Sequence, residues 1–184
     1  MEAMKVKDLM VPLDEYAVIS EDATLFDAVR ALEESRLKYD TRGYRHRAVL
    51  VKDATGAIVG KLSQWDVLRS LEPKYNQIGD LKKLSGFGLS AEFLHSMIDR
   101  FELWKRPLDD LCRKASDLRV GDIVSSPEEA EMIDAEASLN QAVHQLIMGR
   151  HQSLLVKAGE QVAGILRLSD VFGEVAARMR RCKV

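Results

Sequence analysis

Gly60-Lys-Leu-Ser-Gln-Trp-Asp66 recurs near the end of the chain as Gly164-Ile-Leu-Arg-Leu-Ser-Asp170. Each copy follows an apolar run and precedes a stretch whose apolar residues have helical spacing. A similarity between two distant stretches indicates an internal repeat, and a repeat decides the architecture before any single motif does. The two halves are therefore expected to share one fold and to form clefts where they meet.

The repeat continues on the N-terminal side of both copies. Ile19–Val29 matches Ile133–Val143, and Arg45–Lys52 matches Arg150–Lys157. The shift falls from 114 residues in the first match to 105 in the second, so the first copy carries nine additional residues between its helix and its next strand. Val6-Lys-Asp-Leu-Met10 and Val120-Gly-Asp-Ile-Val124 open the two copies, again 114 residues apart.

The composition is that of an ordinary globular protein, with 46% hydrophobic and 30% charged residues among 184. A net charge of −2 gives no reason to expect a nucleic-acid or membrane partner. Cys112 and Cys182 fit neither a metal site nor a disulfide scaffold. The chain contains no apolar run of about 18 residues, and Met1–Lys5 lacks a signal-peptide core. We therefore expect a cytoplasmic protein.

Periodicity and turn signals predict the same five elements in each half. In the first half these are a strand at Tyr16–Ser20, a helix from Leu25 to about Leu37, strands at Ala48–Val51 and Ala57–Leu62, and a helix from Gln64 to about Leu71. In the second half they are strands at Glu131–Asp134, Ser153–Lys157 and Gln161–Leu166, a helix from Leu139 to Gly149, and a helix from Leu168 to about Arg181. Each unit spans only about 60 residues, which is too few to bury enough apolar surface for a clearly stable fold on its own.

The stretch between the halves, residues 73–116, is not a linker by composition. Ala91–Trp104 has a broad apolar helical stripe after a Ser90 cap signal, and Pro107–Ala115 is expected to form a short helix. These helices either pack on the repeats or across a dimer, or form a mobile arm that reports ligand state to a partner.

The element order, the duplication and the Gly-x-x-Ser-x-x-Asp run together resemble a CBS domain pair, also called a Bateman module. The resemblance covers residues 4–72 and 117–181. It implies an α/β (α+β) fold in which tandem β-α-β-β-α repeats, at 1–72 and 117–184, pack as a pseudo-two-fold pair with a helical insert at 73–116.

The resemblance also implies a regulatory function. Such pairs typically bind AMP, ADP, ATP or S-adenosylmethionine between the repeats, require no cofactor, and commonly form disc-like dimers. We expect a non-enzymatic module that is a homodimer and signals by conformational change to an unidentified protein partner. The alternative is a structural or protein-interaction module with degenerate ligand clefts. The sequence shows neither a nucleophile arrangement nor a metal-ligand spacing.

The resemblance places ribose and phosphate contacts on Ser63, Asp66 and Asp170. An ionised carboxylate accepts hydrogen bonds from both hydroxyls of a ribose. The second copy departs from the pattern, because Arg167 occupies the position of the hydroxyl residue. Arg167 could bind a phosphate or fill the cleft with its side chain.

Helix capping is the competing interpretation of both motifs. Ser63-Gln-Trp-Asp66 has the form of a capping box, and Asp is favoured at a helix N-terminus without any ligand. Ser169-Asp170 could likewise serve only as a cap.

The base of the ligand requires an apolar slot, for which we expect Ile19 with Val49 and Ile133 with Leu154. The nine additional residues fall in the basic stretch 38–47, so Arg45 or Arg47 could clamp the phosphates. A solvated loop explains the same stretch, and a nucleic-acid patch fits the acidic remainder of the chain poorly. No metal site is expected.

Overall fold

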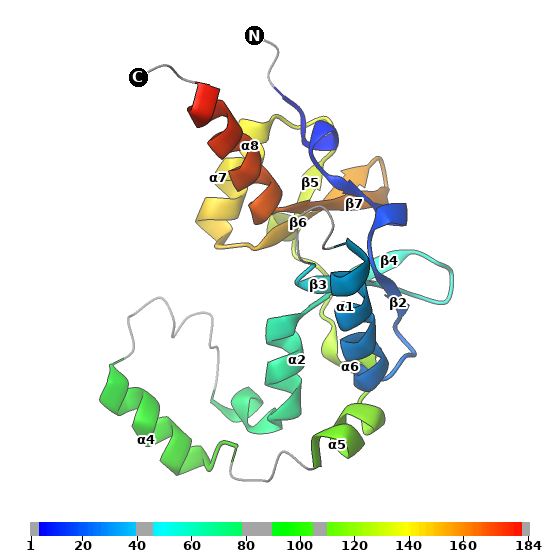
Figure 1. Ribbon diagram of the computed structural model, residues 1–184. Helices are drawn as coiled ribbons and strands as arrows, with labels where there is room; N and C mark the ends of the chain where they lie inside the picture. Colours follow the sequence, from blue (N-terminus) through cyan, green and yellow to red (C-terminus); the bar gives the residue numbers. More distant parts are fainter. Residues whose placement is uncertain (1–3, 40–45, 79–89, 105–109, 182–184) are drawn as a thin grey trace.

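The computed structural model describes residues 4–39, 46–78, 90–104 and 110–181, and it contains two small sheets (Figure 1). The first sheet has the order β2-β3-β4, with β2 at Val18–Ser20, β3 at Ala48–Lys52 and β4 at Ile58–Ser63. Strand β2 pairs parallel with β3, and β3 pairs antiparallel with β4. All three strands belong to the first repeat.

The second sheet repeats this arrangement and adds one strand. Its order is β1-β7-β6-β5, with β1 at Val11–Pro12, β5 at Met132–Asp134, β6 at Ser153–Ala158 and β7 at Gln161–Arg167. Strand β5 pairs parallel with β6, and β6 pairs antiparallel with β7. The added strand β1 comes from the N-terminal segment and pairs antiparallel with β7. The predicted β-α-β-β-α order and its duplication are confirmed.

Three of the four repeat helices begin directly after the capping residues that the sequence signals, Thr24, Ser63 and Ser138, whereas the fourth begins at Leu168, before Ser169. They are α1 at Leu25–Tyr39, α2 at Gln64–Leu71, α7 at Leu139–Gly149 and α8 at Leu168–Arg181. The Thr24 hydroxyl accepts from the Asp27 N–H at 3.1 Å, and Ser138 forms the full box with Gln141. Helix α7 ends at Gly149 as expected, although the left-handed conformation falls on Arg150 instead. Gly149 suits its place because a Cβ there would meet the His151 ring.

The two opening segments are exchanged between the repeats. The backbone N–H groups of Val6 and Lys7 donate to the carbonyls of Ala137 and Ala135, both at 3.0 Å. In the opposite direction, Gly121 in α6 (Val120–Ile123) donates to Glu21 at 2.8 Å. Each repeat is thus completed by a segment that the sequence assigns to the other one.

The buried core follows this exchange. Val6 is fully buried among the apolar residues of the second repeat, and Val120 is fully buried among those of the first. A third cluster brings Leu50 of β3 together with Leu155 of β6 and therefore joins the two sheets. The pair is held by apolar burial at three places, which offsets the small size of each repeat.

The insert contributes η4 at Pro73–Gln77, α4 at Ala91–Phe101 and α5 at Leu111–Asp117. The Ser90 cap is confirmed, but α4 ends before Trp104 because Glu102 adopts a left-handed conformation. Helix α5 packs against α1 and α2, whereas α4 buries none of its residues and lies apart from both sheets in Figure 1. The predicted helix start at Pro107 lies outside the described residues. No helix in the described part of the chain is long and apolar enough to cross a membrane.

Candidate functional site

Ser63 and Asp66 form a closed capping box at the junction of β4 and α2. The Asp66 Oδ2 atom accepts from the Ser63 N–H at 2.8 Å and from the Ser63 hydroxyl at 2.6 Å. The Asp66 N–H donates back to the Ser63 Oγ at 3.3 Å. No hydrogen bond from a described residue reaches the Asp66 Oδ1, and the residue is partly buried. The capping interpretation is therefore correct for the Oδ2 atom of Asp66.

Arg167 and Asp170 occupy the equivalent positions at the junction of β7 and α8. The Arg167 Nε and Nη2 atoms donate to Asp170 Oδ2 and Oδ1, each at 2.7 Å, and the Arg167 N–H donates to Oδ2 at 3.3 Å. Both residues are buried, at 8% and 7% exposure. This is a bidentate, charge-assisted pair, the strongest type of side-chain hydrogen bond.

A cavity of about 420 Å³ lies beside this ion pair. It is formed by the N-terminal segment around β1, by the start of β3 and by one face of α8. Its charged and ionisable lining residues include Glu15, His46, Arg167, Asp170, Glu174 and Arg180. We call this cavity the second cleft; it collects groups from both repeats, because His46 belongs to the first and Arg167 to the second.

His46 stacks on Tyr16 at the edge of the second cleft, with ring centroids 4.1 Å apart and an interplanar angle of 12°. Burial, reinforced by the nearby Arg167 charge, lowers the pKa of His46 to about 4. Burial also raises the pKa of Tyr16 to about 12. Both rings are therefore neutral near pH 7, and Arg167 and Asp170 supply opposite charges beside them.

The matching histidine of the other repeat, His151, has different neighbours. Its Nδ1 is 3.9 Å from Glu131, whose carboxylate is also 3.6 Å from the Lys61 Nζ. Lys61 in turn donates to the Ser153 carbonyl at 2.9 Å. Lys61 thus links β4 of the first repeat to β6 of the second. Neither histidine was predicted as a site residue, although an Arg-His pair begins both matching stretches, Arg45–Lys52 and Arg150–Lys157, and was an available signal.

A comparison with protein-family models matches residues 6–73 to the CBS domain. The first repeat of the chain therefore matches the CBS-domain family. The matched region contains the first heptapeptide with Ser63 and Asp66, and the second half repeats its element order and strand pairing. Among curated proteins, none matches the sequence.

Solved structures with the same fold match this chain over nearly its whole length. CBSX2 in complex with AMP is 19% identical with a TM-score of 0.59, covering 96% of this chain and 98% of that one. A hypothetical conserved protein from Geobacillus kaustophilus is 16% identical with a TM-score of 0.62, covering 96% and 98%. The CBS domain of a bacterial CNNM/CorC family Mg²⁺ transporter in complex with ATP is 16% identical with a TM-score of 0.58, covering 94% and 87%. At these identities the comparisons show the shared fold.

The four predicted base-slot residues lie in the cores of their own repeats. Val49 and Leu154 are fully buried, Ile133 is 7% exposed, and Ile19 packs partly buried against the first core. None of the four is among the residues that line the second cleft. Their contact with a base remains a prediction.

The predicted phosphate clamp is only partly described. Arg45 lies outside the described residues. Arg47 is exposed, and its backbone carbonyl accepts from the Gln64 N–H at 3.0 Å, which ties the start of β3 to the start of α2. The contact of either arginine with a phosphate remains a prediction.

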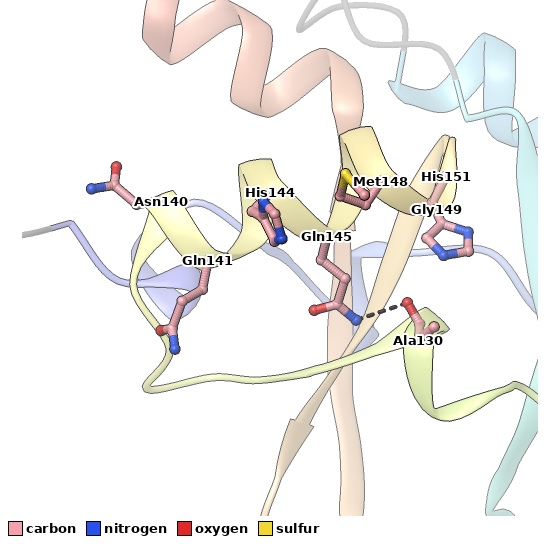
Figure 2. Close-up of a pocket in the computed structure, with 8 residues that line it drawn as sticks. All are labelled: Ala130, Asn140, Gln141, His144, Gln145, Met148, Gly149 and His151. Atoms are coloured by element: carbon pink, nitrogen blue, oxygen red, sulfur yellow. Dashed lines mark hydrogen bonds between the residues drawn. The ribbon is translucent and has the colours of Figure 1, made fainter.

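A second hollow, of about 560 Å³, lies on the surface of α7 in the second repeat (Figure 2). Figure 2 shows the Gln145 side chain reaching from α7 to the Ala130 carbonyl, and it also donates to Met132 at 2.8 Å. Gln145 therefore ties α7 to the segment before β5. Its lining residues include the exposed Met148 and no Asp, Glu, Lys or Arg, so this hollow lacks the paired charges of the second cleft.

Proposed function

We propose that this protein is a regulatory module that binds an adenine nucleotide or a related adenosyl ligand at the Ser63–Asp66 site. The observation that carries the proposal is the divided role of the Asp66 carboxylate. Its Oδ2 is held by Ser63, which fixes the side chain, while no described residue donates to Oδ1. A fixed, partly buried carboxylate oxygen suits a ribose hydroxyl, which is a neutral donor.

The surrounding chemistry supports a nucleotide more than a neutral nucleoside. Ser63 lies at the N-terminus of α2, where the helix dipole favours a phosphate. Arg47, whose backbone lies beside the start of α2, would add positive charge. The same role for Arg45 stays a prediction. CBS-domain structures of the same fold were solved with AMP and with ATP, which supports the same class of ligand here.

In this proposal, ligand binding biases the relative orientation of the two repeats, and a protein partner responds to the change. The Lys61 contacts with Ser153 and Glu131 join the repeats next to the proposed site. A shift of β4 would therefore also shift β6, to which Lys61 is hydrogen-bonded.

We propose that the module is a homodimer. Large apolar side chains are exposed on the repeat helices, including Leu68 on α2 at 58% and Phe172 on α8 at 70%. Burying such side chains against a second copy would stabilise association. Size-exclusion chromatography with light scattering tests this: the wild type should be a dimer, and F172D should shift it toward a monomer. A cytoplasmic location stays a prediction.

Thermal unfolding with AMP, ADP, ATP and S-adenosylmethionine tests the binding proposal. A ligand present at about 100 times its dissociation constant should stabilise the native state by about 2.7 kcal/mol. A stabilisation by at least one member of the panel that is lost in D66A supports the proposed site. A folded protein that none of the four stabilises would contradict the proposal and favour the alternative, an interaction module with degenerate clefts. The internal Arg167–Asp170 pair favours that alternative for the second cleft alone.

A further inference from the structure

The two copies of the heptapeptide use the same aspartate in different ways. In the first copy, Ser63 engages only Oδ2 of Asp66. In the second copy, Arg167 engages both oxygens of Asp170. One substitution between the copies thus changes how much of the carboxylate remains for a ligand.

The Arg167 guanidinium presents to Asp170 what a ribose would present. A ribose has two adjacent hydroxyl donors, and the guanidinium has two parallel N–H donors in a planar fork that matches a carboxylate. With both distances at 2.7 Å, the two oxygens of Asp170 are already satisfied. The guanidinium also neutralises the carboxylate inside a site where both residues are more than nine-tenths buried.

We propose that Arg167 is a built-in occupant of the second cleft, which prevents a ribose from binding Asp170 and limits the chain to one nucleotide. This inference rests on the proposed function of the Ser63–Asp66 site. A ribose could reach Asp170 only by displacing Arg167, which would leave a buried cation without its carboxylate partner. The side chain at position 167 therefore determines how many nucleotides the module binds.

The first repeat supplies the template for a direct test. The substitution R167S gives the second repeat the same Ser-x-x-Asp arrangement that caps α2, so α8 would gain the cap that Ser63 and Asp66 show to be stable in this fold. The reciprocal substitution S63R gives the first repeat the arrangement of the second. R178S removes an arginine that pairs with Glu174 on the exposed part of α8, and it serves as the matched control for loss of charge.

Isothermal titration calorimetry with ATP and, separately, with AMP measures the number of sites per chain. We expect one site in the wild type and in R178S, two sites in R167S, and none in S63R. Circular dichroism of each variant establishes that it is folded before the stoichiometry is compared.

Three results would overturn the inference: two sites in the wild type, an unchanged site number in folded R167S, or normal binding by S63R. If R167S does not fold, S63R decides. A wild type that binds neither probe contradicts the proposed function but leaves the inference separately testable, because R167S should then gain a single site. If R167S also binds neither probe, the inference fails together with the proposed function.

Discussion

Gly60 in β4 packs directly against Val124, so a Cβ at position 60 would overlap the Val124 Cγ1 atom. The equivalent Gly164 in β7 lies beneath the backbone of the other exchanged segment, and a Cβ there would overlap the Val11 carbonyl oxygen. The glycine that opens each heptapeptide is therefore required by packing. It allows the opening segment of the opposite repeat to cross the strand.

Substituting these glycines should destabilise the fold to different degrees. G60A should lower the free energy of unfolding by about 1–3 kcal/mol, the usual cost of overpacking. G164A should cost more, because a backbone carbonyl in a strand pair cannot rotate away as a valine side chain can. Urea denaturation of the two variants measures the difference.

A double-mutant cycle isolates the contact at Gly60. V124A removes the Cγ1 atom that a Cβ at position 60 would meet, so G60A should cost less in the V124A background than in the wild type. G56A serves as a comparison, because Gly56 has open space around it and its substitution strains only a backbone with φ of 88°. Equal costs for G60A in both backgrounds would argue against the proposed packing role.

The buried His46 should make the protein acid-sensitive. Its pKa is about 4 in the folded protein and about 6.5 when unfolded, so the unfolded chain binds more protons between these values. Stability should be complete above about pH 6.5 and fall as the pH drops toward 4, by up to about 3 kcal/mol from this group. Urea denaturation at a series of pH values measures the slope.

H46F is the control for this prediction, because a phenyl ring can keep the stack on Tyr16 without titrating. Its stability should depend less on pH between 6.5 and 4 than that of the wild type. An identical slope in the two proteins would mean that other groups cause the acid sensitivity.

Glu72, which follows α2 directly, should hold the part of the insert around Trp104 in place. Its buried side chain accepts from the Trp104 N–H at 2.9 Å and from the Lys74 N–H at 3.4 Å. Losing the acceptor costs about 1–2 kcal/mol of local stability, so E72A should be cleaved within residues 73–116 about 5–30 times faster in limited proteolysis. Y75F removes only the exposed hydrogen bond to the Trp104 side chain and should be cleaved close to the wild-type rate.

The element order of both repeats was predictable from local signals. The capping residues Thr24, Ser63 and Ser138 give the starts of three helices, because a cap depends only on residues within one turn. The turns at Gly56 and Gly159 were also indicated by glycine, because both positions have a positive φ that glycine adopts more freely than other residues. Because the chain contains this unit twice and each unit is small, the sequence also predicted that the two halves pack against each other.

The features that could not be predicted depend on residues far apart in the sequence. Nothing local to Val6 indicates that it completes the second core, about 130 residues away. The stacking of His46 on Tyr16 likewise arises only when β3 and the segment before β2 come together. For Arg167 the sequence left two roles open, and the distances to Asp170 show an internal ion pair.

Asp66 should be more important for binding than for stability. D66A removes a cap worth about 1 kcal/mol and the proposed ribose acceptor, so nucleotide affinity should fall by about 10- to 100-fold. Q141A removes the corresponding member of the α7 capping box on the other repeat. It should show a similar loss of stability with unchanged nucleotide affinity.

Calorimetric titration of the wild type, D66A and Q141A with ATP and with AMP is therefore the most direct test of nucleotide binding at the Ser63–Asp66 site. The wild type and Q141A should bind at least one of the two nucleotides with equal affinity, and D66A should bind it about 10- to 100-fold more weakly. Equal affinity in D66A and the wild type, or no binding to the folded wild type, would contradict the account.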